Sequence, residues 1–203
     1  MFGIINTTQK RGGTMRLKYS VKDLNEQFYR NAVDELTERY KDYVSNFQVF
    51  NKNLSTNVTP CERKDPVTGE TVEFDYPLAY NIWIIYNYII SEIDMSRRNV
   101  IEHNNILEID RQVSEKQGII NRKWLDSRIG FLNYVAKRKL ELIRGRDFSA
   151  FETGVVVGVS GQAIINRIKR DTPLKAKKKK NKWVIRNEDV RRLVKESDSP
   201  ILK

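Results

Sequence analysis

Two groups of side chains between residues 160 and 182 have the types and spacing needed to bind another molecule. In the first group, Gln162, Asn166 and Lys169 lie on a helix face opposite the apolar Ile164 and Ile168, provided that residues 161–170 are helical. Gln and Asn side chains can form paired hydrogen bonds with adenine. This face therefore has the chemistry to contact the edges of bases.

The second group is a lysine run at residues 177–180, followed by Lys182. Such a run is also compatible with a solvated loop tip, and nuclear localisation is a third interpretation that nothing in the sequence requires. The run lies between two short segments of β type, residues 174–177 and 183–185. Because this places the lysines at the tip of a hairpin, we favour phosphate binding.

Positive charge is concentrated near the C-terminus. The whole chain contains 37 Lys and Arg against 26 Asp and Glu, a formal net charge of +11. Residues 150–203 hold 14 basic and 6 acidic residues, hence +8 of that charge. A basic surface on one module is typical of nucleic-acid binding, which gains affinity by releasing condensed counterions.

Local signals predict the elements that position these side chains. Ser149 and Glu152 have the spacing of a capping box at a helix start, and Gly158 can end that helix in a left-handed turn. Ser160 can cap a second helix over residues 161–170, which must stop before Pro173. After the hairpin, a closing helix opens at residue 187 and carries Val190, Leu193 and Val194.

This stretch resembles the winged helix-turn-helix of the excisionase-type and MerR-type families. The resemblance is carried by FSAFE at 148–152, GVS at 158–160, LKA at 174–176 and WVIRNEDV at 183–190, about a quarter of the chain. In these families the helix after the GVS turn enters the DNA major groove, and the hairpin, or wing, lies along the backbone or minor groove. Gly154 and Gly161 depart from the family pattern and weaken both helices.

The resemblance implies contacts with double-stranded DNA. Matched by position, Gln162, Ala163, Asn166 and Lys169 face the major groove, where the amides favour a half-site that contains adenine. The wing lysines and Arg170 supply salt-sensitive affinity. The complete expected DNA-binding set is Ser160, Gln162, Ala163, Asn166, Lys169, Arg170, Lys177, Lys178, Lys179, Lys180 and Lys182.

The expected fold class is mainly α, with an N-terminal helical domain that contains a small hairpin and a C-terminal winged helix-turn-helix. The expected parts are a flexible N-terminal arm (1–19), the helical domain (20–146), the DNA-binding domain (147–197) and a tail (198–203). The arm includes Met15, which follows a Lys-Arg-Gly-Gly run. This run can be encoded by a purine-rich stretch like a ribosome-binding site, so Met15 is an alternative start.

Within the helical domain, Ser20 is expected to cap a helix reaching to about residue 49. Residues 63–74 contain a turn signature and predict a short hairpin. Residues 78–95 are apolar nearly all round, which predicts the central core helix. The aromatic residues of that segment, among them Trp83, can either pack in the core or form a base-stacking platform, and we favour core packing.

Residues 121–144 form the longest amphipathic segment. Its apolar positions recur every three or four residues: Leu125, Ile129, Leu132, Ala136, Leu140 and Ile143. This seam can dock on the protein's own core or pair with a second copy, and we favour docking because three heptads is the minimum for a coiled coil. Residues 145–147 are too few for a free linker, so the two domains are expected to hold a semi-fixed orientation.

Catalytic and metal-binding patterns are absent from the sequence. A single histidine, His103, and a single cysteine, Cys61, exclude a His/Cys zinc cluster and an intrachain disulfide. His103 lies in a polar stretch, residues 99–110, and is expected to be exposed. No phosphate loop, signal peptide or membrane span is found. We therefore expect a cytoplasmic protein that is not an enzyme and needs neither a cofactor nor a metal.

These patterns together predict a sequence-specific double-stranded DNA-binding protein, acting as a dimeric transcriptional regulator. The abundance of Asn, Ile, Lys and Tyr is compatible with an AT-rich genome of a bacterium, phage or plasmid. The alternative is a DNA packaging or replication-initiation adaptor, similar to a small terminase subunit, that docks on a specific site. A protein-interaction adaptor is a third possibility, and it leaves the basic charge unexplained.

Overall fold

The computed structural model describes residues 17–47, 61–74, 77–116, 124–170 and 174–202. Within these residues the chain is mainly helical, with two small antiparallel sheets. The N-terminal part contains η1 (Val21–Asp23), α1 (Glu26–Phe47), β1 (Cys61–Lys64), β2 (Thr71–Phe74), α3 (Pro77–Ile89), α4 (Arg97–Lys116) and α6 (Arg128–Ile143). The C-terminal part contains β3 (Phe148–Ser149), α7 (Ala150–Val157), α8 (Gly161–Lys169), β4 (Ala176–Lys179), β5 (Lys182–Ile185), α9 (Asn187–Glu196) and η2 (Pro200–Leu202).

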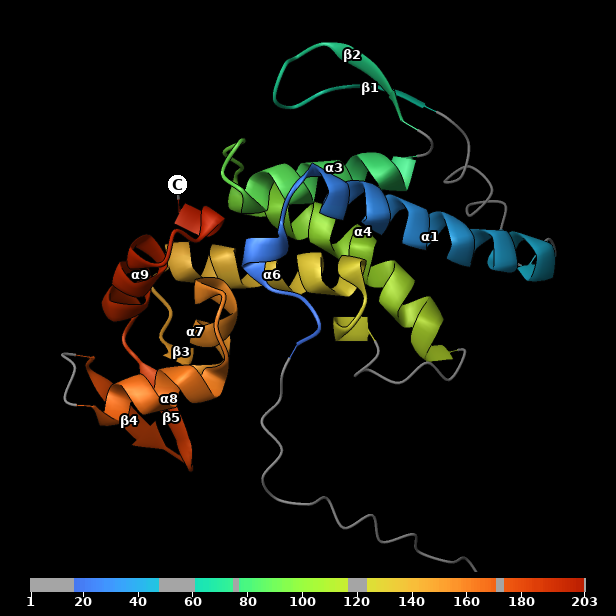
Figure 1. Cartoon of the computed structure of the whole chain (residues 1–203). Coiled ribbons are helices and arrows are strands. Elements are labelled where there is room, and N and C mark those ends of the chain that lie inside the picture. The colour runs from blue at the N-terminus through green and yellow to red at the C-terminus, as the bar shows by residue number, and fades with distance from the viewer. Residues whose placement is uncertain (1–16, 48–60, 75–76, 117–123, 171–173, 203) are drawn as a thin grey trace, which may run out of the picture.

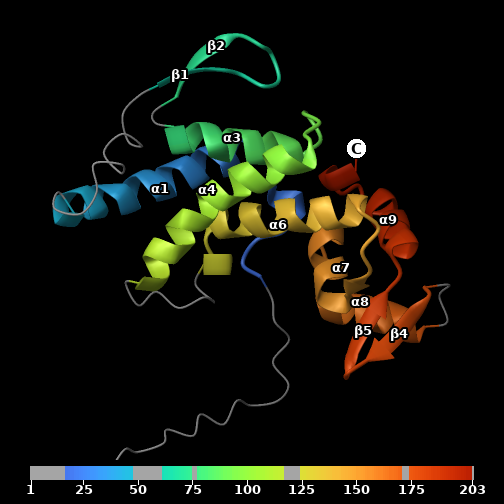
Figure 2. The ribbon, with the colours of Figure 1, turned by 180° about the vertical axis from the view of Figure 1, so that it is seen from behind.

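The two sheets lie at opposite ends of the molecule. Figures 1 and 2 show the β1–β2 hairpin projecting from one side of the helices α1, α3, α4 and α6. The elements from β3 to α9 gather around the C-terminal end of α6, with β4 and β5 at the far side. The expected hairpin over residues 63–74 is confirmed, with Cys61 paired to Phe74 and Lys64 to Thr71.

Helix α3 is the centre of the core. It packs against α1, α4 and α6, and its Ile82, Ile85 and Ile89 are fully buried. Tyr86 and Tyr88 are only 5% and 2% exposed, which confirms the prediction of core packing for these two, while Trp83 is half-buried and packs against the edge of the core. The sequence predicted a helix reaching to about residue 95, but α3 ends at residue 89 because the next residues form a turn in which Ser91 has a φ of 67°.

Helix α6 docks on the protein's own core. Ile129, Leu132 and Ala136 from the predicted seam are fully buried, and α6 packs against α3 and α4. The helix begins at residue 128 because Ser127 caps it, accepting a hydrogen bond from the Gly130 amide at 3.0 Å. Residues 121–123 of the expected segment lie outside the described residues. The central residues of the seam therefore pack against the core of this chain.

Two expectations for the N-terminal part were wrong. Ser20 does not open a long helix: its capping box with Asp23 closes a single 3-10 turn, η1. Helix α1 starts at residue 26, where the Asn25 side chain accepts a hydrogen bond from the Phe28 amide at 2.8 Å. The expected helix also reached residues 48 and 49, which lie outside the described residues.

The second error concerns His103, which was expected to be exposed, and which lies with residues 99–110 in α4. Val100, Asn104 and Leu107 are buried at helical spacing, and the Asn133 amide donates to the Asn104 carbonyl oxygen at 3.0 Å. His103 is half-buried rather than exposed, with its Nδ1 2.6 Å from the Asn81 side-chain oxygen. Burial lowers the pKa of His103, against the charge of Glu102.

The C-terminal part is tied to α6 by buried polar contacts. The Asn187 side-chain amide donates to the carbonyl oxygens of Leu142 and Arg146 at 2.8 and 3.0 Å, and the Asn187 backbone amide donates to Asp147. One continuous cluster of buried apolar residues runs from α1 to α9. These contacts set the orientation of β3–α9 against the helices, while the boundary between domains at residue 147 stays a prediction.

A buried lysine joins α6 to the end of α3. Lys139 is 5% exposed, and its Nζ donates to the Tyr88 carbonyl at 2.6 Å, the Ile89 carbonyl at 3.3 Å and the Ser91 hydroxyl at 2.8 Å. These carbonyls lie at the C-terminus of α3, where the helix leaves acceptors without intrahelical partners and a positive charge is favourable. Burial nevertheless lowers the pKa of Lys139 to about 8, against the charge of Asp94.

This pKa predicts a rise in stability with pH. In the unfolded chain Lys139 keeps its ordinary pKa of 10.5, so between pH 8 and 10.5 the unfolded state binds more protons than the folded state. The unfolding free energy of the wild type minus that of Lys139→Met should therefore increase from pH 8 to 9.5, by at most about 1.4 kcal/mol per pH unit. Urea unfolding of both proteins measures this difference, and a constant difference would contradict the assignment.

Candidate nucleic-acid interface

Short-range capping contacts define the pair α7 and α8, as the sequence predicts. The Ser149 hydroxyl accepts from the Glu152 amide at 3.3 Å, and the Glu152 carboxylate accepts from the Ser149 amide at 2.9 Å. Gly158 follows α7 with a φ of 80°, in the left-handed region. The Ser160 hydroxyl then caps α8 by accepting from the Ala163 amide at 3.1 Å. Each of these local predictions is confirmed.

The two helices touch at glycines. A Cβ on Gly154 would lie 2.7 Å from the Val159 carbonyl oxygen and 2.8 Å from the Gly161 nitrogen, and one on Gly161 would lie 3.0 Å from the Phe151 Cα. From the sequence, both glycines were expected to be weak points of their helices. The structure shows why glycine stands at both positions: the two backbones come so close there that a Cβ would crowd the facing backbone atoms.

Helix α8 has one buried face and one exposed face. Ile164 is 1% exposed and Ile168 is half-buried, whereas the side chains expected to contact DNA are exposed: Gln162, Ala163, Asn166, Lys169 and Arg170. The Gln162 amide donates to the Asn166 side-chain oxygen at 2.9 Å, so these two side chains form one hydrogen-bonded pair on the surface. Arg170 caps the helix end instead of lying within the helix.

The lysine run forms a strand as well as a turn. Ala176 pairs with Ile185 and Lys179 with Lys182, leaving a two-residue turn of Lys180 and Asn181. These two residues have φ values of 44° and 62°, the left-handed conformation of a tight hairpin turn. The sequence predicted a β segment ending at Lys177 with the following lysines at the hairpin tip, but β4 continues through Lys178 and Lys179. All four lysines of the run, and Lys182, are exposed.

A third strand was not expected. β3 pairs with β5 through Phe148 to Ile185 and Ser149 to Val184, which gives the strand order β3-β5-β4. Phe148 is fully buried, and β3 leads directly into α7. The sheet therefore fixes the hairpin relative to α7 and α8.

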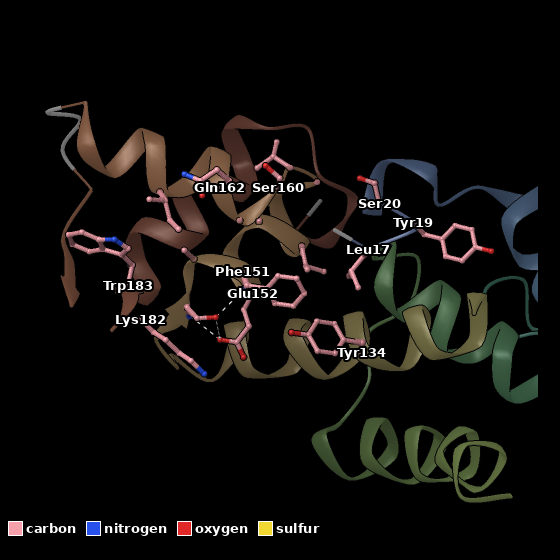
Figure 3. Close-up of a pocket in the computed structure, with 18 of the residues that line it drawn as sticks. Leu17, Tyr19, Ser20, Tyr134, Phe151, Glu152, Ser160, Gln162, Lys182 and Trp183 are labelled. Carbon is pink, nitrogen blue, oxygen red and sulfur yellow. Dashed lines mark hydrogen bonds between the residues drawn. The ribbon is translucent and has the colours of Figure 1, made fainter. Parts of the chain in front are cut away.

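A groove of about 1300 Å³ lies between α8, the hairpin and the N-terminal segment. Figure 3 shows Lys182 and Trp183 at one end, Ser20 and Leu17 at the other, and Ser160 between them. Residues 17–23 were not expected at this site from the sequence. Only their long-range packing against α7 brings them there.

The Glu152 carboxylate lies in this groove, and two arginines neutralise its charge. It forms ion pairs with Arg138 and with Arg146, the latter at 2.7 Å. Burial by itself raises the pKa of Glu152, but hydrogen bonds from Arg146 and Ser149 and the charge of Arg138 hold it below its ordinary value. The carboxylate is thus ionised and neutralised by its neighbours, so it adds little repulsion toward an anion.

Two further expectations are that the chain holds no metal and crosses no membrane. Among the described residues, no group of three or more His, Cys, Asp and Glu side chains is placed to hold a metal ion. No helix in the described ranges is long and apolar enough to cross a membrane.

The contact between α7 and α8 predicts the effect of one added methyl group. Gly154→Ala should lower the unfolding free energy by about 1–3 kcal/mol, because the new Cβ overlaps backbone atoms that cannot move independently. Helix propensity predicts the opposite, a gain of about 1 kcal/mol. Urea unfolding decides between them, with Lys195→Ala on the exposed face of α9 as a control near zero. A stabilised Gly154→Ala protein would refute the close contact.

Comparison of the chain with protein-family models, with curated proteins and with solved structures found no match. The resemblance to excisionase-type and MerR-type families accordingly stays a prediction from the residues.

Proposed function

We propose that this chain binds double-stranded DNA sequence-specifically, through a winged helix-turn-helix formed by α7, α8, the β4–β5 hairpin and α9. The observation that carries the proposal is the exposed face of α8. Its opposite face packs in the core through Ile164, while Gln162 and Asn166 are exposed as a hydrogen-bonded pair beside a lysine-bearing hairpin. Amide side chains on a helix next to a cationic strand match what the major groove and its phosphates require.

In this mechanism the two groups of side chains have different tasks. The major groove is about 12 Å wide and admits a helix, so α8 can place Gln162, Asn166 and Lys169 at base edges. The β4 lysines and Lys182 bind phosphates, which gives affinity without sequence preference and makes binding salt-dependent. The β3–β5 pairing holds the hairpin at a fixed position relative to α8. A single orientation of the protein on the duplex therefore makes both the base contacts and the phosphate contacts.

We further propose that the protein acts as a homodimeric transcriptional regulator. Because Ile129, Leu132 and Ala136 of the α6 seam are buried within the chain, we place the dimer contact mainly on other surfaces. Two copies related by a two-fold axis read an inverted repeat whose half-sites lie about one helical turn apart. Light scattering separates this regulator from a packaging adaptor, since the adaptor forms a larger ring.

Replacing one amide tests the role of α8. Asn166→Ala should reduce the ratio of affinities for the preferred duplex and a random duplex by about 5- to 150-fold, the effect of about 1–3 kcal/mol for a bidentate base contact. Affinity for random DNA should hardly change. Fluorescence anisotropy with both duplexes measures the ratio. Equal losses on both duplexes would contradict the assignment of α8 as the helix that reads sequence.

Removing hairpin charge tests the role of the wing. Replacing Lys178, Lys179 and Lys180 with Ala should weaken binding to all duplexes alike and reduce the slope of log affinity against log salt by about 2.7, ~0.9 for each lost phosphate contact. A control variant, Arg63→Ala with Lys64→Ala, removes two charges from the distant hairpin β1–β2. If the triple variant and this control have the same slope, β4 does not contact phosphate.

A further inference from the structure

We propose that the N-terminal segment, residues 17–23, holds a second stretch of DNA backbone through Lys18 and Lys22, at the end of the groove away from Lys182 of the wing. This inference rests on the proposed function and extends the DNA-binding surface beyond the winged helix. The partner is the sugar-phosphate backbone of the same duplex that α8 reads.

The segment is anchored, so its lysines have defined positions. Val21 is fully buried in the core. On either side of it, the Ser20 amide donates to the Asp23 carboxylate at 2.7 Å and the Lys22 amide donates to the Ser20 hydroxyl at 3.3 Å. Lys18 and Lys22 themselves are exposed. The buried Val21 side chain and the capping box therefore fix the segment that carries the exposed Lys18 and Lys22.

That turn lies against the start of α8. A Cβ on Gly158 would be 2.9 Å from Cγ of Lys22 and 3.2 Å from the Ser20 hydroxyl, so the Lys22 side chain lies across the turn between α7 and α8. Lys18 lines the same groove as Ser160 and Gln162. Figure 3 shows Ser20 at the end of the groove opposite Lys182 and Trp183.

The charges around the groove suit an anionic strand. Lys18 and Lys182 line its two ends, and the N-terminus of α8 adds the positive end of a helix dipole. Two carboxylates also line it. Asp23 accepts the Ser20 amide, and Glu152 is paired with two arginines. The two arginines neutralise Glu152, whereas Asp23 keeps its negative charge. Lys18, Lys22 and Lys182 together outnumber that one charge, so the groove remains cationic toward approaching DNA.

The positions fit a duplex that has α8 in its major groove. The two strands that border the groove run on either side of the inserted helix. Lys182 of the wing lies at one end of the protein groove, and the segment that carries Lys18 and Lys22 lies at the other, beside the turn that leads into α8. Two separate stretches of DNA backbone then each have a cationic contact, which limits the angle at which α8 enters the major groove.

The test uses the full chain and a random-sequence duplex over 50 to 200 mM salt. Lys18→Ala with Lys22→Ala should weaken binding and reduce the slope of log affinity against log salt by about 1.8, ~0.9 for each lost phosphate contact. Lys18→Arg with Lys22→Arg keeps both charges and should bind like the wild type. Arg63→Ala with Lys64→Ala removes the same charge from the distant hairpin and should keep the wild-type slope. Thermal unfolding confirms that each variant is folded.

The possible failures can be told apart. If the Lys18 and Lys22 alanine variant behaves like the Arg63 and Lys64 variant while the wing triple variant still weakens binding, the second contact is overturned and the proposed function stands. The second contact is also overturned if the arginine variant loses affinity as the alanine variant does, because charge is then not what matters. If the wild type binds no duplex at 50 mM salt, the proposed function itself fails.

Discussion

The close contact between α7 and α8 is the constraint on which the candidate interface depends. Glycines at 154 and 161 let the two backbones meet, and Gly158 turns the chain between them. This contact directs Ile164 into the core and leaves the face with Gln162 and Asn166 exposed. A larger side chain at either contact glycine separates the helices, and then neither the exposed face of α8 nor the groove beside it keeps its geometry.

The part of the chain that carries this pair is attached to the helices by buried polar groups rather than by a flexible link. Asn187 of α9 bonds the backbone at the end of α6, and within the helical part Lys139 of α6 bonds the backbone at the end of α3. Buried helix termini require such partners, because unsatisfied carbonyl groups are costly away from water. The same polar groups therefore satisfy helix ends and help to position the candidate interface. The N-terminal segment packs beside α7 and lines the groove next to that interface.

The sequence predicted best what short-range contacts determine. The capping roles of Ser149, Gly158 and Ser160 were predictable because each involves residues only a few positions apart. Strand β3 was missed because it has two residues and pairs with a strand more than thirty positions away. The second half of β4, Lys178 and Lys179, was missed because lysine has a low preference for strands. In α4 the buried Val100 and Leu107 have helical spacing, but the polar residues between them hid it.

In the candidate site too, short-range patterns predicted one part and long-range packing determined the other. The exposed face of α8 follows from helical periodicity, whereas the groove brings together residues 17–23 and α8, which only the tertiary fold places side by side. The glycines of α7 and α8 show how packing can reverse a local inference. Intrinsic propensity counts a helical glycine as a loss of about 1 kcal/mol, and here the contact between backbones requires it.

The most direct test of sequence-specific DNA binding is selection from a pool of random duplexes by the full-length wild-type protein at two salt concentrations, with sequencing of the bound DNA. We predict that one motif is enriched at both concentrations, as an inverted repeat with half-sites about one helical turn apart. Binding that disappears at the higher salt and enriches no motif would contradict sequence-specific recognition by α8.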